Sequence, residues 1–564
     1  MASLTMLMRR LTVLSALTAA GLISFIVAMG SAHARDQLTI GVSQFPSNFH
    51  PMIDSTLART YILGFGQRPV TVYDPDWALT CLLCEELPTL ENGLATLEER
   101  EGGEMGVAVT YTLPEGAVWG DGTPMTTADV LFTWEVGKHP ESGIANFEFF
   151  QNDILDITVT GDRQFTLHLD KVTCEFASIS GFYLLPSHLE QPVFEADPAA
   201  YAERTLYDTD TTNPGLYYGP YRITHVDQGS AVVLERNENW WGEAPAFDRI
   251  VVRTIGNTAA LSANLLSGGI DMIAGELGMA LDEAIAFEPR ARDRFNFVYR
   301  PGLIYEHIDL NLDNPMLADK RVRQALLFAL DREQINDRLF DGRQPVAKTN
   351  VNPLDAVFNA EVAEYPFDPE RAAQLLNDAG WTPGPDGIRR NSDGEALRLT
   401  FQTTAGNATR ELVQQVLQQQ WRALGIESVI DNQPARVFFG ETVRKRQFPH
   451  LAMFAWISSP RSIPRTTLHS EMIPTEANNW AGQNNTGFQN AEVDELLEAL
   501  EDTCEPEANQ ALWDRLQAIY AEELPALPLY FRANAHVLPK WLSGLRPTGH
   551  QFPSSYWVEE WRSE

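Results

Sequence analysis

The chain has 564 residues, and its 76 Asp and Glu against 42 Lys and Arg give a formal net charge of −34. A composition that is 44% hydrophobic and 10% aromatic supplies enough apolar surface for a large core, which excludes a disordered chain. The acidic balance and the lack of a basic block exclude nucleic-acid binding, because neutralising phosphates needs clustered Lys and Arg.

The first 34 residues have the pattern of a secretory signal. Arg9-Arg10 precedes an apolar run from Leu11 to Met29, and Ala32-His33-Ala34 forms a small-residue cleavage site. We predict that residues 1–34 are removed on export and that the mature chain is a soluble protein of the periplasm. An uncleaved anchor is the alternative, since the 19 mostly apolar residues approach the length that spans a bilayer.

Short β-rich runs alternate with amphipathic helices along the rest of the chain, which indicates an α/β fold without repeats. Strands are predicted at Leu38 to Val42, Ala231 to Glu235 and Ile250 to Ile255. Capping residues and a 3.6-residue apolar period predict helices. These helices run from Lys320 to Arg332 behind Asp319, from Asp368-Pro369 to Gly380, and onward from Asn490.

Four cysteines, at positions 81, 84, 174 and 504, are too few for a disulfide-built scaffold. The spacing of Cys81 and Cys84 fits a redox-active pair, half of a metal site or a local disulfide. No nearby Cys or His supplies a second ligand pair, which favours a structural role. Whether Cys81 pairs with Cys84, and Cys174 with Cys504, stays open at this point.

The motifs of common enzymes and nucleotide sites are missing from the sequence. It has no G-x-S-x-G elbow, H-E-x-x-H helix, G-x-x-x-x-G-K-[ST] loop or G-x-G-x-x-G turn. Acidic pairs are too common among 76 acids to nominate a catalytic couple. We therefore predict a protein that is not an enzyme and that holds no cofactor and no metal.

Four segments stand in a fixed order along the chain. They are YTLPEGAVWGDGTPMTTADVLFTWE from Tyr111, GPYRITHVDQGSAVVLERNENWWG from Gly219, RVRQALLFALDRE from Arg321, and an Asp-Pro helix, Ala-Gly-Trp, hairpin and Leu-Gly-Ile between Phe367 and Ile426. Together they resemble the family 5 extracellular solute-binding proteins of ABC importers, which include oligopeptide-, dipeptide- and nickel-binding proteins. Each motif alone is weak, but four in the family's order are specific.

The resemblance implies a two-lobed α/β clamp of the type II periplasmic-binding-protein class, in its large peptide-binding subclass. It places lobe I at 35–297 plus 533–564 and lobe II at 304–525. The hinge crossings are expected at 298–303 and 526–532. Two parallel crossings form a hinge, so a ligand that contacts both lobes favours the closed form.

Peptide binders of this family carry a Trp on lobe II and, three residues later, an Asp that holds the ammonium terminus of the peptide. The corresponding segment here is Ala455 to Ser470, in which Trp456 aligns with the Trp and Ser459 stands in place of the Asp. Because a buried ammonium without a carboxylate is unfavourable, this departure weakens the case for α-amino recognition of ordinary peptides.

Two arginines, Arg461 and Arg465, enter the same segment, and a guanidinium suits a carboxylate or a phosphate. They are either part of an anion site, partners of lobe I acids, or surface residues. Trp456 and Trp480 either stack on a ligand ring or side chain, or pack in the core.

The resemblance adds candidate ligand contacts outside this segment. Phe45, Asn48 and His50 lie on the loop after the first strand, which is the usual cleft entry of the family. Tyr305 and His307 follow the first hinge crossing and are expected to face the cleft.

The expected function is a monomeric periplasmic receptor that captures a peptide or peptide-like solute and delivers it to the permease subunits of an ABC importer in the inner membrane. One alternative is a receptor for an oligosaccharide or an anionic small molecule, opine-like or phosphorylated, that uses Arg461 and Arg465. Another is a chaperone-like binder of extended chains.

Overall fold

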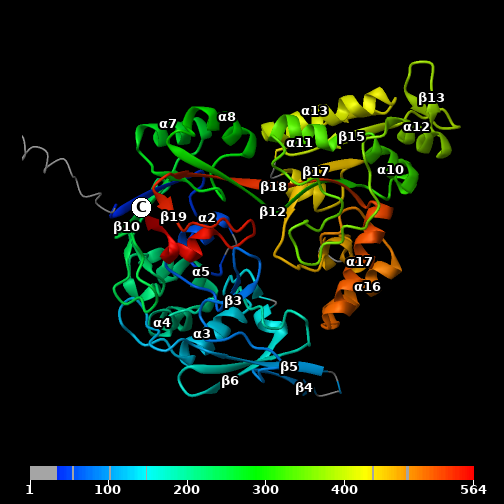
Figure 1. Ribbon diagram of the computed structural model, residues 1–564. Coiled ribbons are helices and arrows are strands. Elements are labelled where there is room, and N and C mark those ends of the chain that lie inside the picture. The colour runs from blue at the N-terminus through cyan, green and yellow to red at the C-terminus, as the bar shows by residue number, and fades with distance from the viewer. Residues whose placement is uncertain are drawn as a thin grey trace, which may run out of the picture.

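The computed structural model describes residues 35–53, 56–100, 103, 105–147, 149–434, 437–477, 480 and 482–564. Two lobes lie side by side and share two long strands, β12 and β18 (Figure 1). The predicted signal segment, residues 1–34, lies outside the described residues. The two-lobed α/β clamp expected from the sequence is the observed architecture.

One ten-stranded sheet runs through both lobes, in the order β16-β15-β17-β12-β18-β11-β1-β10-β9-β8. The bounds of these strands are β1 Gln37–Val42, β8 Tyr221–Asp227, β9 Ala231–Arg236, β10 Arg249–Thr254, β11 Met272–Ile273, β12 Phe295–Leu310, β15 Arg398–Gln402, β16 Glu427–Ile430, β17 Leu451–Ile457 and β18 Ala526–Pro539. At the centre of the sheet β12 and β18 pair antiparallel, so each belongs to both lobes.

The pairing of β12 with β18 is irregular where the strands pass from one lobe to the other. Pro301 pairs with Ala533 and Tyr305 pairs with Phe531, with a shift of register between them. A bulge of this kind bends the strand and increases its twist. The predicted crossings at 298–303 and 526–532 fall within these two strands.

Gly302 lies in this bulge, against the C-terminal segment. The backbone N–H of Leu303 donates to the carbonyl oxygen of Gly549 at 2.8 Å. A Cβ atom at Gly302 would come within 2.2 Å of the same oxygen. The close approach of two backbones therefore needs glycine at position 302.

Lobe I contains β1, β8 to β11 and a separate four-stranded sheet in the order β4-β5-β7-β6. The bounds of that sheet are β4 Ala95–Glu99, β5 Met105–Thr112, β6 Ile154–Thr160 and β7 Gln164–Leu169. The helices of lobe I are α2 Leu57–Leu63, α3 Thr127–Gly137, α4 Ser187–Ala196, α5 Tyr201–Arg204, α6 Leu206–Thr209, α7 Thr258–Ser267 and α8 Leu281–Ala291.

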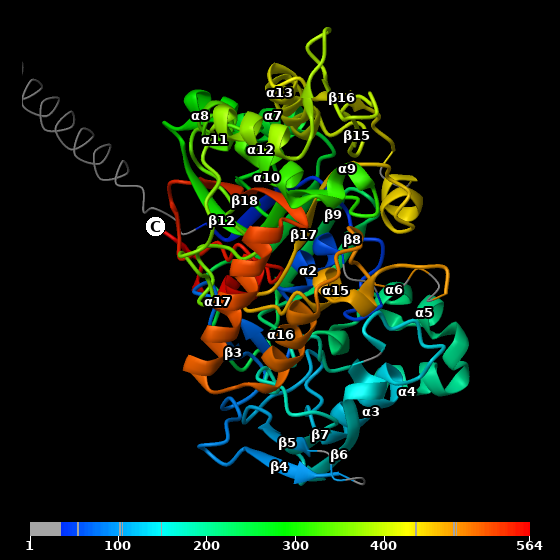
Figure 2. The ribbon, with the colours of Figure 1, turned by 90° about the vertical axis from the view of Figure 1, so that its right-hand side faces the viewer.

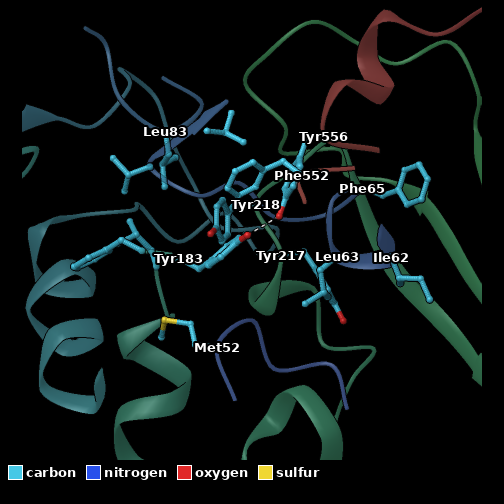
Figure 3. Packing of buried hydrophobic residues seen from close by; sticks show 14 of the residues in the cluster. Met52, Ile62, Leu63, Phe65, Leu83, Tyr183, Tyr217, Tyr218, Phe552 and Tyr556 are labelled. Carbon is cyan, nitrogen blue, oxygen red and sulfur yellow. Dashed lines mark hydrogen bonds between the residues drawn. The ribbon is translucent and has the colours of Figure 1, made fainter. Parts of the chain in front are cut away.

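The C-terminal segment returns to lobe I and closes its core. Tyr183 and Tyr556 are both buried, and their hydroxyl groups lie 2.5 Å apart (Figure 3). Phe552 and Tyr218 pack in the same cluster. Lobe I is thus completed by residues from both ends of the chain.

Lobe II contains β15 to β17 and the helices that follow β12. Their bounds are α9 Pro315–Ala318, α10 Lys320–Phe328, α11 Arg332–Phe340, α12 Pro369–Asp378, α13 Ala408–Ala423, α15 Arg465–Leu468, α16 Ala491–Asp502 and α17 Pro506–Glu523. Helices α16 and α17 extend from the start of β18 toward the four-stranded sheet of lobe I (Figure 2).

The capping signals of the sequence hold in lobe II, with one correction. Asp319, Asp368 and Asn490 each accept a backbone N–H at the start of α10, α12 and α16. The helix predicted to reach Arg332 ends at Phe328 instead. Asp331 accepts the backbone N–H of Gln334 and so starts a new helix, α11.

Smaller elements complete the two lobes. Two-stranded pairs join β2 Thr71–Tyr73 to β3 Leu79–Cys81, β13 Thr382–Pro383 to β14 Arg389–Arg390, and β19 Leu542–Ser543 to β20 Arg562–Ser563. Short 3₁₀ and π segments lie at Phe149–Asp153, Pro198–Ala200, Pro214–Leu216, Phe438–Val443, Ser470–Met472 and Ser554–Glu560.

All four cysteines form disulfides, which answers the question that the sequence left open. Cys81 pairs with Cys84 inside lobe I. Cys174 pairs with Cys504, across 330 residues of sequence and from lobe I to lobe II.

Among the described residues, no helix combines the length and the apolar character needed to cross a membrane.

Candidate ligand-binding cavity

A cavity of about 270 Å³ lies beside the strands that cross between the lobes. Its walls come from β12, the end of β17, the loop that follows β17, and α17. Gln551, in the C-terminal segment of lobe I, also lines it. The cavity is therefore built mainly by lobe II, and the C-terminal segment of lobe I contributes Gln551 to its lining.

Alternate residues of β12 form one wall. Tyr305, His307 and Asp309 point to the same face because side chains of a strand alternate. The rings of Tyr305 and His307 stack with centroids 4.9 Å apart. The Tyr305 hydroxyl lies 2.9 Å from that of Tyr520 on α17. Burial raises the pKa of Tyr305 well above its ordinary value, and the neighbouring Tyr520 adds a smaller rise in the same direction. The phenol of Tyr305 therefore stays neutral.

Both ring nitrogens of His307 face acceptors. Nδ1 lies 3.1 Å from the Tyr305 carbonyl oxygen, and Nε2 lies 3.2 Å from Oδ1 of Asp309. A protonated imidazole can donate to both acceptors, and a neutral ring to only one. His307 and Asp309 are both buried, so this pair is a polar unit of the cavity wall.

Asp355 brings a second carboxylate to the cavity from the loop after Asn352. Its Oδ2 accepts the backbone N–H of Arg461 at 2.8 Å. Burial raises the pKa of Asp355, and hydrogen bonds from backbone N–H groups oppose that rise. Within the described part of the chain, no Lys or Arg side chain lines the cavity. Its charge balance thus favours a ligand with hydrogen-bond donors or a positive charge.

Within the described residues, the end of β17 has no second partner strand at the cavity, although its Met453 carbonyl oxygen accepts the Thr403 hydroxyl at 2.7 Å. β15 pairs with β17 only at Leu451 and Ala452, whereas β12 pairs along the whole strand to Ile457. Among the described strands, β12 alone pairs with residues 453–457. Exposure rises along this stretch, from buried Phe454 to Ile457, which is 51% exposed.

One hydrogen bond crosses the cavity mouth between the lobes. The amide nitrogen of Gln551 in lobe I donates to Oγ of Ser459 in lobe II at 3.1 Å. Ser459 is the residue that stands where peptide binders of the family have Asp. Its hydroxyl is thus engaged by lobe I.

Four of the ten predicted ligand residues line this cavity: Tyr305, His307, Trp456 and Ser459. The strand pairing explains why they meet, because Tyr305 lies directly opposite Trp456 in the sheet. Trp456 also packs edge to face against Phe454.

The three predicted residues of lobe I lie elsewhere. His50 is fully buried, with Nε2 3.1 Å from the Tyr201 hydroxyl. Burial, and then Arg59, lowers the pKa of His50, so it stays neutral inside the lobe. The Asn48 side chain accepts the backbone N–H of His50. Phe45 packs edge to face on Phe49. This loop is held by the core of lobe I.

The predicted anion site is not assembled. Arg461 turns away from the cavity, and its Nε lies 3.3 Å from Glu175 of lobe I. Arg465 lies 3.7 Å from both Glu471 and Glu501. Arg461 is thus paired with a carboxylate of lobe I, whereas Arg465 lies near two carboxylates and its buried Nη1 makes no hydrogen bond to a described residue. Trp480, whose backbone N–H donates to the Thr475 carbonyl oxygen, also lies outside the cavity lining.

Sequence reasoning missed Asp309, Asp355 and Tyr520. Asp309 follows His307 by two residues, so the strand period could have added it to the same face. Asp355 and Tyr520 carry no local signal, because they reach the cavity from a loop and a helix that are distant in sequence.

The opposite face of the crossing strands carries a buried ion cluster. Glu306 is fully buried and accepts Nε of Arg410 at 2.7 Å and a guanidinium N–H of Arg532. Burial alone would raise the pKa of Glu306, but the two guanidinium groups outweigh it and the pKa is lowered. A cavity of about 390 Å³ adjoins Arg410 and Arg532.

The described residues contain no grouping of three or more His, Cys, Asp or Glu side chains arranged to hold a metal ion.

Comparison with known proteins identifies a matching family. The family model of the bacterial extracellular solute-binding proteins, family 5 Middle, matches residues 91–469. The oligopeptide-binding protein AppA of Bacillus subtilis is 25% identical over 549 residues, which cover 94% of this chain and 92% of that protein.

Solved structures share the fold over nearly the whole chain. The oligopeptide-binding protein from Thermus thermophilus, complexed with a pentapeptide, is 31% identical, with a TM-score of 0.74 and coverage of 94% of this chain and 96% of that one. NikZ from Campylobacter jejuni, in complex with Ni(L-His), has a TM-score of 0.73 over 94% of this chain and 100% of that one. At 22% identity, the likeness to NikZ shows the fold alone.

Proposed function

Because the chain belongs to the bacterial extracellular solute-binding proteins of family 5, we propose that it is a receptor that captures peptides between its two lobes for an ABC importer. The relatives named above as oligopeptide-binding proteins support peptides as the ligand class. The absence of any assembled anion site in the described cavity disfavours the opine-like or phosphorylated ligands considered as the alternative.

The observation that carries the proposal is the edge of β17 beside the cavity, which has no second partner strand in the described part of the chain. An extended peptide can add to such an edge as a further strand, with main-chain hydrogen bonds that do not depend on its sequence. Exposed Ile457 and the cavity behind Trp456 would then receive alternate side chains. This geometry suits a peptide better than a compact sugar.

We assign the ligand contacts to Tyr305, His307, Trp456 and Ser459. Asp309 and Asp355 supply the carboxylates that a peptide ammonium needs, in place of the Asp that Ser459 replaces. The preferred ligands are therefore peptides with a free amino terminus or a basic side chain close to it.

The hinge of the clamp is assigned to the irregular pairing of Pro301 to Tyr305 with Phe531 to Ala533. A bend there moves the two halves of the large sheet relative to each other. We further propose that the receptor is exported to the periplasm, acts as a monomer and hands its peptide to permease subunits in the inner membrane.

Two measurements test the peptide assignment. Mass spectrometry of the denatured protein should detect copurified peptides, and calorimetry against a panel of 3- to 9-residue peptides, a rough length range for an extended chain, should detect binding. Trp456→Ala should weaken that binding, whereas Trp240→Ala in lobe I serves as the matched control. Binding of oligosaccharides or phosphorylated compounds, with no response to any peptide, would refute the proposal.

A further inference from the structure

The Cys174–Cys504 disulfide joins the two lobes at a place remote from the hinge. Cys174 lies on the loop after β7 in lobe I, and Cys504 lies in the turn between α16 and α17 in lobe II. The 18-residue helix α17 separates Cys504 from the start of β18. At ~1.5 Å per residue, this helix is about 27 Å long.

Noncovalent contacts also join the two lobes around the disulfide. The backbone N–H of Cys174 donates to the carbonyl oxygen of Glu501 at 3.1 Å. Glu175 meets Arg461 at 3.3 Å and also accepts the Tyr73 hydroxyl at 2.8 Å. We use the word seam for this group of lobe I residues 174–175 and lobe II residues 461, 501 and 504. The Arg461–Glu175 pair is partly exposed and contributes little, so the disulfide is the strongest link in the seam.

A covalent bond at this position restricts any opening about the hinge. The two Cα atoms lie 4.9 Å apart, and a disulfide tolerates at most about 6.8 Å. The distance between the two Cα atoms can therefore increase by only ~2 Å. At the end of α17, a lever about 27 Å long, that increase corresponds to a rotation of the lobes by about 4°. An extended peptide between the lobes needs one strand spacing of about 4.8 Å on each side. The two walls that hold it must therefore lie about 10 Å apart.

We propose that the Cys174–Cys504 disulfide is a redox-controlled latch on the ligand cleft. The idea rests on the proposed function, since it assumes that the lobes separate to exchange a ligand. With the disulfide intact, the lobes cannot separate at the seam and ligand exchange is slow. With the disulfide reduced, only noncovalent contacts hold the lobes together away from the hinge, among them the Gln551–Ser459 hydrogen bond, and the clamp opens about its hinge.

The disulfide lies at a solvent-exposed residue, Cys504, from which a reductant can approach it. Cys504 is exposed, whereas Cys174 is half-buried. A thiolate of a dithiol reductant attacks Sγ of Cys504, the protein S–S bond breaks, and Cys174 leaves as a thiolate that takes up a proton. The second thiol of the reductant then attacks the mixed disulfide and frees Cys504. One protein disulfide gains two electrons and two protons, and the dithiol becomes a disulfide.

The second disulfide provides a matched control. Cys81 and Cys84 are three residues apart in lobe I, so their bond spans no gap between lobes. C81S/C84S removes a disulfide without touching the seam, and C174S/C504S removes the latch. Reduction of the wild-type protein with dithiothreitol opens both bonds and provides a measurement without substitutions.

Small-angle X-ray scattering of ligand-free protein, refolded from guanidinium chloride under oxidising conditions, tests the latch without reference to any ligand. Thiol titration of the oxidised wild type should find no free thiol. C174S/C504S and the reduced wild type should have a larger radius of gyration than the oxidised wild type, and C81S/C84S should not. Equal radii in all four samples, or free thiols in the oxidised protein, would overturn the proposal.

Release of a bound fluorescent peptide provides the kinetic readout. We expect release from C174S/C504S to be at least about tenfold faster than from the wild type, because the change acts on dissociation. If no peptide binds, the peptide assignment fails while the scattering result still decides the latch. Equal release rates combined with peptide binding would overturn the latch and leave the peptide assignment standing.

Discussion

Nε of Arg461 lies 3.3 Å from the Glu175 carboxylate, and this contact ties lobe II to lobe I beside the Cys174–Cys504 disulfide. The arginine that the sequence suggested for an anionic ligand is thus matched to an acid of the chain itself. Both side chains remain partly in contact with solvent, which limits the strength of their pairing.

Arg461→Ala should therefore have little effect on stability or on peptide affinity. We expect the free energy of unfolding to fall by less than about 1 kcal/mol, because exposed ion pairs contribute little. Denaturant unfolding and calorimetry check the two quantities, with Arg465→Ala as a second arginine on the same segment. A loss of affinity that is restricted to acidic ligands would instead place Arg461 in the ligand site.

Glu306→Gln should be strongly destabilising. The substitution leaves Arg410 and Arg532 close together without the buried carboxylate that both contact. Removing one partner of a buried ion cluster typically costs about 3 to 5 kcal/mol. Urea unfolding at neutral pH measures the loss, and Glu495→Gln on the exposed side of α16 is the control. A loss equal to that of the control would mean that water already screens the cluster.

Buried histidines should make the protein less stable as the pH falls below about 6.5. Burial lowers the pKa of His550 from 6.5 to about 4, and the pKa values of His50 and His536 are also lowered. Between these values the unfolded chain binds a proton that the folded chain does not, so acid favours unfolding.

His550 alone should reduce the free energy of unfolding by about 2 kcal/mol between pH 7 and pH 5. Urea unfolding at the two pH values measures this difference. It should be smaller in His550→Gln, whereas substitution of exposed His225 by Gln should leave it unchanged. Parallel pH dependence in the wild type and His550→Gln would show that other groups control acid stability.

Asp355→Asn should reduce the preference for peptides with a free amino terminus. The carboxylate lines the cavity, whereas an amide there cannot balance an ammonium charge. We expect affinity for a free peptide to fall at least about tenfold, which corresponds to ~1.4 kcal/mol, and affinity for its acetylated form to change less. Calorimetry with both forms measures the ratio. An unchanged ratio would assign the ammonium to Asp309 or to solvent.

Local patterns predicted the elements that depend on neighbours in sequence. Asp319, Asp368 and Asn490 start helices because a cap needs only a side chain and the next few N–H groups. The helix predicted through Arg332 ended early because Asp331 is itself a cap, a competition between two local signals. The family motifs established the two-lobed fold.

The candidate site was only half predictable from local patterns. Tyr305, His307 and Trp456 were found because the family resemblance placed the first hinge crossing before Tyr305 and aligned Trp456 with the Trp of the peptide binders, and all three line the cavity. His50, by contrast, lies inside lobe I because Tyr201 and Tyr207, which are distant from it in sequence, pack against its ring.

By itself the sequence determined the class of the fold, the acidic surface charge and the helix caps, since each follows from composition or from short-range contacts. The tertiary structure alone decided which carboxylates line the cavity, which acids pair with Arg461 and Arg465, and that Cys174 reaches Cys504. These facts depend on side chains from distant segments that meet across two lobes. Such meetings are governed by how the long strands and helices carry those segments through space, and no local pattern records them.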